Sequence, residues 1–247
     1  MKNEEKKEEL NIVEDCGGIQ PPKDLLAPSI TEIVFILDAS GSMRGLEGDT
    51  IGGVNAILDK QKKLQNGDTV YVSTVIFNTR SKVLHDRADL AKVEPMKMEQ
   101  YEVSGCTALY DAVGDAIRHI SNVHKYARKE DVPSKTMFVI MTDGMENASR
   151  RYHLSDVKRL IEQKQNKYNW EFIFLAANID AGDAAENLGI ARERAIDWHA
   201  DGAGVQVLYE CTSAYIDNAR KGRAYDRGVF EGVDKDFSQR APKKDKK

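Results

Sequence analysis

The sequence has few cysteines, and their spacing argues against the common cysteine-based sites. The 247 residues include only Cys16, Cys106 and Cys211, which form no C-x-x-C pair and no Cys/His cluster with zinc spacing. An odd number of distant thiols suits a reducing compartment, so we expect a cytoplasmic protein. Cys16 and Cys211 are interpreted as small filler residues, and Cys106 as a filler or a redox-sensitive thiol.

Long apolar runs and a strong charge of one sign are also lacking. No apolar stretch approaches the roughly 18 residues that cross a bilayer, and the charged residues 1–10 lack the apolar core of a secretory signal, so we expect no membrane association. The formal net charge is −4, with acidic and basic residues mixed along the chain, which argues against nucleic-acid binding.

Several catalytic motifs are missing as well. The sequence has no G-x-x-x-x-G-K-[ST] phosphate loop and no G-x-S-x-G nucleophile elbow. The histidines have no H-E-x-x-H or other ligand spacing and are interpreted as surface or core residues: His85, His119, His124, His153 and His199. These absences disfavour an enzyme.

From Ile30 onward the sequence alternates apolar, strand-like runs with amphipathic helical segments. Strands are expected at 33–37, 70–77, 82–84, 137–141, 170–176 and 195–198, and helices at 49–66, 107–126, 153–165, 181–188 and 204–220. This order predicts an α/β fold with a doubly wound, mainly parallel sheet, helices on both faces and one short antiparallel edge strand. Trp170 and Trp198 are expected in the core.

The chain divides into three parts by composition. Residues 1–28 are charged and contain prolines, and are interpreted as a lead-in to the domain. Residues 29–221 are expected to form the α/β domain, because 41% of the whole chain is hydrophobic and the alternating pattern lies there. Residues 222–247 are interpreted as a polar, lysine-rich tail exposed to solvent.

Oxygen-bearing side chains follow two of the expected buried strands. Asp38, Ser40 and Ser42 come directly after Ile33–Leu37, and Asp143 follows Met137–Met141. In doubly wound sheets ligands bind at the carboxyl ends of the strands, where these loops and the one that carries Thr107 converge if the two strands are neighbours. Each residue alone is explained as a helix cap or a turn. Together they predict a site for Mg²⁺, with Mn²⁺ or another divalent cation as alternatives.

The balance of charge at this site predicts how it is used. Hydroxyl groups are weak neutral ligands, and only Asp38 and Asp143 supply negative charge. If these carboxylates reach the ion through water, the ion stays electrophilic and favours another anionic oxygen from outside. We therefore expect a metal-dependent binding module whose partner protein supplies an Asp or Glu side chain.

The same residues resemble a known family. Asp38-x-Ser40-x-Ser42, Thr107 in G-x-T-x-L and Asp143 in T-D-G look like the metal-ion-dependent adhesion site (MIDAS) of von Willebrand factor A (VWA) domains, with all positions present. The resemblance covers roughly residues 30–221. It implies direct metal ligation by the serines and, in a ligand-competent state, by Thr107, and water-mediated ligation by the two aspartates.

The resemblance extends to the amino-acid sequence around the predicted site. The stretches DASGSM at 38–43 and TDGMENAS at 142–149 look like those of bacterial or phage intracellular members of the family. The helix expected at 204–220 looks like the element that shifts in switching members. Four residues that flank the predicted metal loops are candidate partner contacts: Met43, Arg44, Glu146 and Asn147.

Two other functions stay open from the sequence. A metal-assisted phosphoryl transferase or phosphatase on a similar sheet would also place an Asp after the first strand. Such phosphatases need a second carboxylate as D-x-D, where this chain has Ser40. An accessory subunit of an ATP-driven remodelling complex is the other possibility, and it is a special case of the binding function.

Overall fold

A six-stranded sheet forms the centre of the molecule. The computed structural model describes residues 29–64 and 67–240, so the predicted lead-in at 1–28 and the chain from 241 onward lie outside the described residues. The strands lie in the order β3-β2-β1-β4-β5-β6. All neighbours pair in parallel except β2 and β3, which are antiparallel. The predicted fold class is therefore confirmed.

The elements follow the alternation seen in the sequence. The strands are β1 (Ile30–Asp38), β2 (Thr69–Phe77), β3 (Ser81–Asp89), β4 (Lys135–Thr142), β5 (Glu171–Ala176) and β6 (Ala195–Asp197). The α-helices are α1 (Glu47–Lys63), α2 (Leu109–Tyr126), α3 (Leu154–Tyr168), α4 (Ala181–Asn187), α5 (Gly202–Arg220) and α6 (Glu231–Arg240). Within the described residues, no helix is both long enough and apolar enough to span a bilayer.

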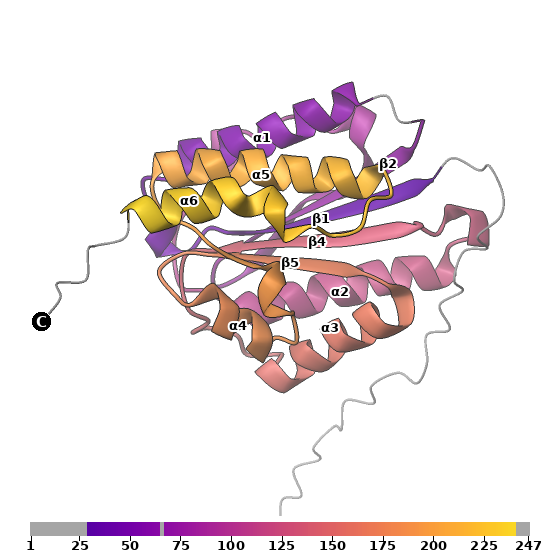
Figure 1. The fold of residues 1–247 in the computed structure, drawn as a ribbon. Coiled ribbons are helices and arrows are strands. Elements are labelled where there is room, and N and C mark those ends of the chain that lie inside the picture. Colours follow the sequence, from indigo (N-terminus) through magenta and orange to yellow (C-terminus); the bar gives the residue numbers. More distant parts are fainter. Residues whose placement is uncertain (1–28, 65–66, 241–247) are drawn as a thin grey trace, which may run out of the picture.

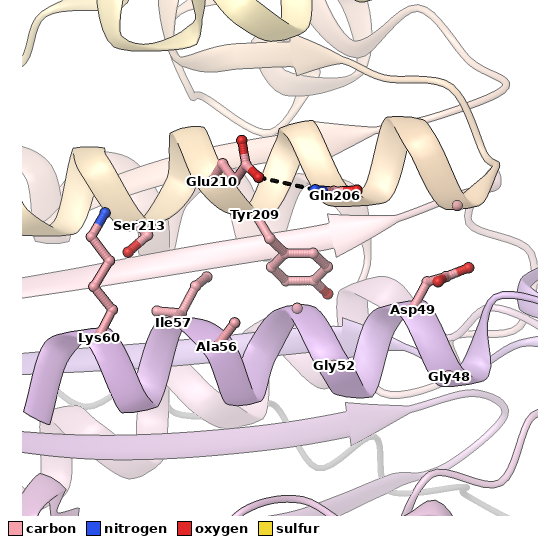
Figure 2. Close-up of a pocket in the computed structure, with 12 residues that line it drawn as sticks. Gly48, Asp49, Gly52, Ala56, Ile57, Lys60, Gln206, Tyr209, Glu210 and Ser213 are labelled. Carbon is pink, nitrogen blue, oxygen red and sulfur yellow. Dashed lines mark hydrogen bonds between the residues drawn. The ribbon is translucent and has the colours of Figure 1, made fainter.

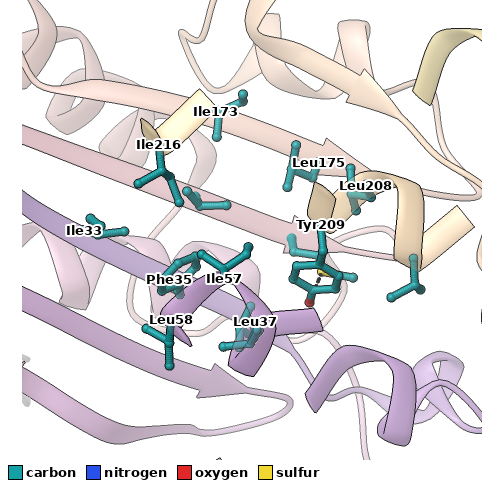
Figure 3. Packing of buried hydrophobic residues seen from close by; sticks show 14 of the residues in the cluster. Ile33, Phe35, Leu37, Ile57, Leu58, Ile173, Leu175, Leu208, Tyr209 and Ile216 are labelled. Carbon is teal, nitrogen blue, oxygen red and sulfur yellow. Dashed lines mark hydrogen bonds between the residues drawn. The ribbon is translucent and has the colours of Figure 1, made fainter. Parts of the chain in front are cut away.

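Helices cover both faces of the sheet (Figure 1). Helices α1, α5 and α6 lie on one face, and α2, α3 and α4 lie on the other. Successive residues of β1 belong to opposite cores, because side chains of a strand alternate between its two faces. Ile33, Phe35 and Leu37 pack toward α1 and α5 (Figure 3), whereas Val34 and Ile36 pack toward α2. The continuous apolar run of β1 is thus explained by burial on both faces.

The antiparallel edge strand is longer than the sequence pattern predicts. The expected strand covered only residues 82–84, but β3 runs through Ser81–Asp89 and pairs with β2 along its length. Its side chains are mostly exposed or half-buried, so the sequence shows no apolar run there. The register shifts between Val72 and Val75, and Arg87 adopts a left-handed conformation with φ of 45°. Because of these irregularities, the sequence of the strand does not show a regular alternation of apolar and polar residues.

The packed fold extends beyond the predicted domain boundary at residue 221. Residues Arg227–Phe230 form a 3₁₀ turn that leads into α6, and Phe230 and Val233 are buried. The ring of Phe237 stacks on His199, with 4.6 Å between centroids. The prediction of a solvent-exposed tail from residue 222 is therefore wrong for 227–240. A few apolar residues are enough to pack this charged segment on the domain, because α5 supplies the surface that they contact.

This packing predicts that Phe230 contributes to stability. Replacing a fully buried phenylalanine by alanine leaves a cavity, so Phe230→Ala should lower the free energy of unfolding by about 3–5 kcal/mol. Urea denaturation measures the change. Lys235→Ala is the control, because this side chain on the following helix α6 is exposed and pairs with Glu231 alone among the described residues, and the change should alter stability by less than about 0.5 kcal/mol. Equal stability of Phe230→Ala and wild type would contradict the packing of the 3₁₀ turn that precedes α6.

Candidate metal centre

The pairing of β1 with β4 brings the two predicted aspartates to one place. Leu37 lies opposite Met141, so Asp38 and Asp143 both lie where these neighbouring strands end. Chain connections leave β1 toward β2 on one side and reach β4 on the other, which makes this crevice the switch point of the sheet. The Thr142 hydroxyl donates to Asp38 Oδ2 at 2.6 Å and fixes that carboxylate.

The serine hydroxyls connect the two carboxylates. Ser42 Oγ donates to Asp143 Oδ1 at 2.6 Å, and the hydroxyl oxygens of Ser40 and Ser42 lie 3.1 Å apart. The Ser40 backbone N–H donates to Asp38 Oδ1 at 2.7 Å, which folds the loop back on itself. The first loop therefore turns its alternate side chains to one side, as the spacing predicts.

Thr107 reaches the same point from a third loop. A Cβ built on Gly144 would lie 3.6 Å from Ser42 Oγ and 3.9 Å from Thr107 Oγ1, so both hydroxyls face this glycine. The Gly41 N–H donates to the Gly105 carbonyl at 3.1 Å, which ties the Thr107 loop to the serine loop. The structure thus brings together all the predicted metal residues: Asp38, Ser40, Ser42, Thr107 and Asp143.

The two carboxylates are buried, and burial opposes their ionisation. Asp38 is 1% exposed and Asp143 is 2% exposed. Burial raises the pKa of Asp38 despite hydrogen bonds from Thr142 and Ser40. Burial also raises the pKa of Asp143, the Ser42 hydroxyl opposes this shift, and the nearby charge of Asp38 adds to it. Asp143 Oδ2 is buried without a hydrogen-bond partner among the described residues. A cation would offset all three costs.

The donors suit a small hard cation bound by few protein groups. Among residues 29–64 and 67–240, no cluster of three or more His, Cys, Asp or Glu side chains has the arrangement of a metal site. The candidate site instead combines two carboxylates with the hydroxyls of Ser40, Ser42 and Thr107. Hydroxyl and carboxylate oxygens fit Mg²⁺ or Mn²⁺, which keep several waters when bound.

The predicted partner contacts have different roles in the structure. Met43 is fully buried in the core, so its prediction as a surface contact is wrong. Its side chain packs inward because the 3₁₀ turn at Gly41–Met43 directs it under the loop. Arg44, the next residue, is exposed. Asn147 is also exposed, but its Oδ1 accepts the Thr107 N–H at 2.9 Å, and its own N–H donates to the Thr107 carbonyl.

Glu146 is used mainly inside the molecule. Its Oε1 accepts the N–H groups of Ala148 and Ser149, and its Oε2 accepts the Tyr110 N–H in the first turn of α2 at 3.0 Å. The carboxylate therefore caps a helix N-terminus from another loop, where a negative charge is favourable. Together with the Asn147 pair, this contact holds the Asp143 loop against the Thr107 loop.

Asp111 anchors the far end of the Asp143 loop. Its carboxylate accepts the backbone N–H groups of Arg150, Arg151 and Tyr152 at 2.9–3.1 Å. Burial alone would raise the pKa of Asp111, but these three hydrogen bonds and the Arg151 charge bring it below its usual value. The sequence pattern does not single out Asp111, since partners about 40 positions away leave no local signal.

Other side chains near the site were also missed. The Tyr101 hydroxyl donates to the Asp38 carbonyl from a segment read as plain loop. Met145, two residues after Asp143, is 71% exposed, which is unusual for a large apolar side chain.

Three residues named in the sequence analysis lie as follows. Cys106 is an exposed free thiol next to Thr107. Trp170 and Trp198 are in the core as expected.

A separate hollow of about 630 Å³ lies between α1 and α5 (Figure 2). The ring of Tyr209 points from α5 toward α1, where Gly53 makes room for it, since a Cβ there would lie 2.2 Å from the ring. None of the five candidate metal residues lines this hollow. It is therefore a feature of the helix layer and not part of the crevice at the strand ends.

Comparison with known proteins identifies the family and the fold. Residues 27–186 match the family model described as "VWA domain containing CoxE-like protein". A von Willebrand factor type A structure from Catenulispora acidiphila is 14% identical with a TM-score of 0.52, and the match covers 76% of this chain and 42% of that chain. No curated protein sequence matches.

A second similar structure is proximal thread matrix protein 1 of the mussel byssus, solved with a zinc-occupied MIDAS motif. It is 16% identical with a TM-score of 0.50, and the match covers 76% of this chain and 46% of that chain. At such identities the likeness shows a shared fold. The present chain spans less than half the length of both solved chains.

The Asp111 contacts predict a specific dependence of stability on pH. Because the folded pKa lies below the usual 3.8, the ionised carboxylate stabilises the fold above that pH, and the stabilisation is lost as pH falls through the folded pKa. Asp111→Asn should lower the free energy of unfolding near neutral pH by about 1–3 kcal/mol. It should also lose less stability than wild type between about pH 5 and pH 3.

Denaturation at several pH values measures both effects. Asp115→Asn serves as the control, because it removes the neighbouring ion pair with Arg151 and keeps the three backbone contacts of Asp111. An acid dependence that is unchanged in Asp111→Asn would contradict the assignment.

Proposed function

The chain belongs to the CoxE-like family of VWA domains, and from this premise we propose that it is a divalent-metal-dependent protein-binding module without catalytic activity of its own. VWA domains are generally protein-interaction modules, which makes binding the first function to consider. The resident ion is proposed to be Mg²⁺, with Mn²⁺ or another divalent cation as alternatives. The partner is proposed to be a protein that presents an Asp or Glu side chain.

One observation carries the metal proposal. Within residues 29–64 and 67–240, Asp143 Oδ2 is buried without a hydrogen-bond partner beside a second buried carboxylate, Asp38, in a crevice lined by hydroxyls. Burying a carboxylate oxygen without a partner costs free energy of folding, and a cation at this point would offset that cost. Following the family pattern, Ser40, Ser42 and Thr107 would hold the ion directly, and the two aspartates would hold it through water.

The donor set also supports the binding role. When bound, the ion supplies positive charge and a coordination position for an outside oxygen. The hydroxyls of Ser40, Ser42 and Thr107 neutralise none of that charge, and the two buried aspartates stay anchored by Thr142 and Ser42. A partner carboxylate is therefore the expected final ligand. The mussel structure with a zinc-occupied MIDAS motif supports metal binding by motifs of this kind.

The enzyme alternative lacks a supporting observation. A phosphatase of the D-x-D type needs a second carboxylate at position 40. This chain has Ser40 there, which is buried and whose hydroxyl oxygen lies 3.1 Å from that of Ser42. Asp38 itself accepts hydrogen bonds on both oxygens, which leaves it poorly placed as a nucleophile.

The cellular setting is proposed from the family, the free thiols and the sequences of the candidate metal loops. The CoxE-like family is linked to chaperone-like roles, which supports the alternative of an accessory subunit in an ATP-driven remodelling complex. The free thiols Cys106 and Cys211 suit a reducing cytoplasm. The amino-acid sequences of the candidate metal loops favour a bacterial or phage intracellular protein.

Metal binding should stabilise the folded protein. A ligand at about one hundred times its dissociation constant stabilises by about 2.7 kcal/mol, so saturating Mg²⁺ or Mn²⁺ should raise the melting temperature by several degrees. Asp38→Ala should abolish this response, and differential scanning calorimetry with and without EDTA measures it.

Asp143→Asn provides the control for folding. It keeps the shape of the side chain and the acceptor for Ser42 but removes one of two buried negative charges. In EDTA it should melt at or above the temperature of wild type, and in Mg²⁺ it should show no further increase. A metal response that survives in both variants would contradict the site assignment.

Partner binding should depend on the same ion. A pull-down from the source cell in Mg²⁺, with wild type and Asp38→Ala as paired baits, should retain proteins that EDTA releases and that the variant does not capture. Partners retained equally in EDTA would exclude a metal-bridged interface. Hydrolysis of phosphate esters that is lost in Asp38→Ala would instead favour the enzyme.

A further inference from the structure

The surface around the candidate metal site carries unpaired charges and an exposed apolar side chain. Arg44 and Arg80 are exposed, and their guanidinium groups form no ion pair or hydrogen bond within the described residues. Met145 is 71% exposed. Each residue belongs to a different loop of the crevice. We call this set, Arg44, Arg80 and Met145, the rim.

Arg80 lies on the turn between β2 and β3, which packs against the Thr107 loop. The Asn78 carbonyl accepts the Ala108 N–H at 2.9 Å, and the Thr79 hydroxyl accepts the Cys106 N–H at 3.0 Å. The turn is closed by the Arg80 N–H, which donates to Asn78 Oδ1. These contacts fix the backbone of Arg80 on the β2 side of the crevice and leave its charged head in solvent.

Arg44 and Met145 border the crevice in other directions. Arg44 follows the serine loop at the end of the 3₁₀ turn and lies toward α1. Met145 follows Gly144, which faces the hydroxyls of Ser42 and Thr107, and so lies on the β4 side. The neighbouring Asn178 Nδ2 donates to the Asp143 carbonyl, which braces this loop from β5. The rim thus carries one arginine on the β2 side, one arginine just before α1, beside the acidic first turn of that helix, and an apolar side chain on the β4 side.

We propose that the rim selects an extended acidic segment of a partner protein, with one carboxylate at the metal, a further acidic residue at Arg80 or Arg44, and an apolar residue at Met145. This inference rests on the proposed metal-dependent binding function and specifies its partner. Exposed arginines without partners attract carboxylates, and a solitary exposed methionine adapts to varied apolar side chains.

The order of the strands sets the spacing along that segment. The turn of Arg80 and the loop of Met145 lie on opposite sides of β1, so a segment crossing the strand ends meets the arginine, the metal residues and the methionine in that order. Neighbouring strands are about 4.8 Å apart and an extended chain advances about 3.3 Å per residue. The acidic and apolar residues are therefore expected within about three positions of the metal-binding carboxylate.

Acidic side chains also lie near the rim, and the Glu47 carboxylate accepts the N–H of Gly45, next to Arg44. Glu102 is exposed on the segment that leads to the Thr107 loop. Its charge opposes an acidic ligand, so it provides a variant with the opposite expected effect. Reversing the charge at position 102 should strengthen the binding of an acidic segment, and reversing the charge at position 80 should weaken it.

The test uses a library of nine-residue synthetic peptides with a fixed central Asp and random flanks, selected on the full chain in Mg²⁺. The expected peptides carry Asp or Glu on one side of the centre and an apolar residue on the other. For a selected peptide, Arg80→Glu should weaken binding about fivefold or more and Glu102→Lys should strengthen it, with both effects reduced at high salt. Met145→Asp should remove the apolar preference.

The melting response to Mg²⁺ distinguishes the two levels of the proposal. If the Mg²⁺ shift is intact in Arg80→Glu and Met145→Asp and the selected flanks are neutral or unaffected by these variants, the rim inference is wrong and the metal site stands. If wild type shows no Mg²⁺ shift and peptide selection is the same in EDTA, the proposed function itself fails. Selection of basic flanks would also overturn the rim inference.

Discussion

The site depends on the parallel pairing of β1 with β4 at the switch point of the sheet. This register sets Leu37 opposite Met141, so that Asp38 and Asp143 meet where the two strands end. Both carboxylates are buried there, and one oxygen of Asp143 has no partner among the described residues. A fold that holds two buried carboxylates together loses stability unless a cation or a proton joins them. The strong apolar pairing of the central strands keeps them in place.

A second constraint comes from the loops that surround the crevice. Asp111, Glu146 and Asn147 use their polar groups on the backbone of neighbouring loops and on the first turn of α2. This network fixes the backbone under the hydroxyls of Ser42 and Thr107. The fold itself thus holds these hydroxyls in place, and such preorganisation would lower the entropic cost of binding the proposed ion. The side chains left free for a partner are those that the network does not use.

Sequence pattern predicted the fold where burial is continuous and missed it where burial is partial. The apolar runs of β1, β4 and β5 are surrounded by the two helix layers, so each run is visible without knowledge of its neighbours. The side chains of β3 are exposed or half-buried and α6 buries only Val233, and the polar composition of both segments is that of exposed loops and tails. Tertiary contacts with β2 and α5 decide that these segments are ordered.

The sequence by itself determined the set of candidate oxygen donors and the strand ends near which they lie, because each candidate comes shortly after an apolar run or shortly before a helix. The tertiary structure decided which flanking residues face outward. Met43 is buried and Met145 is exposed, although both are apolar residues next to a candidate metal loop. Asn147 and Glu146 bond to residues 40 and 36 positions away. Such partners are set by the packing of loops from different strands, which no local pattern encodes.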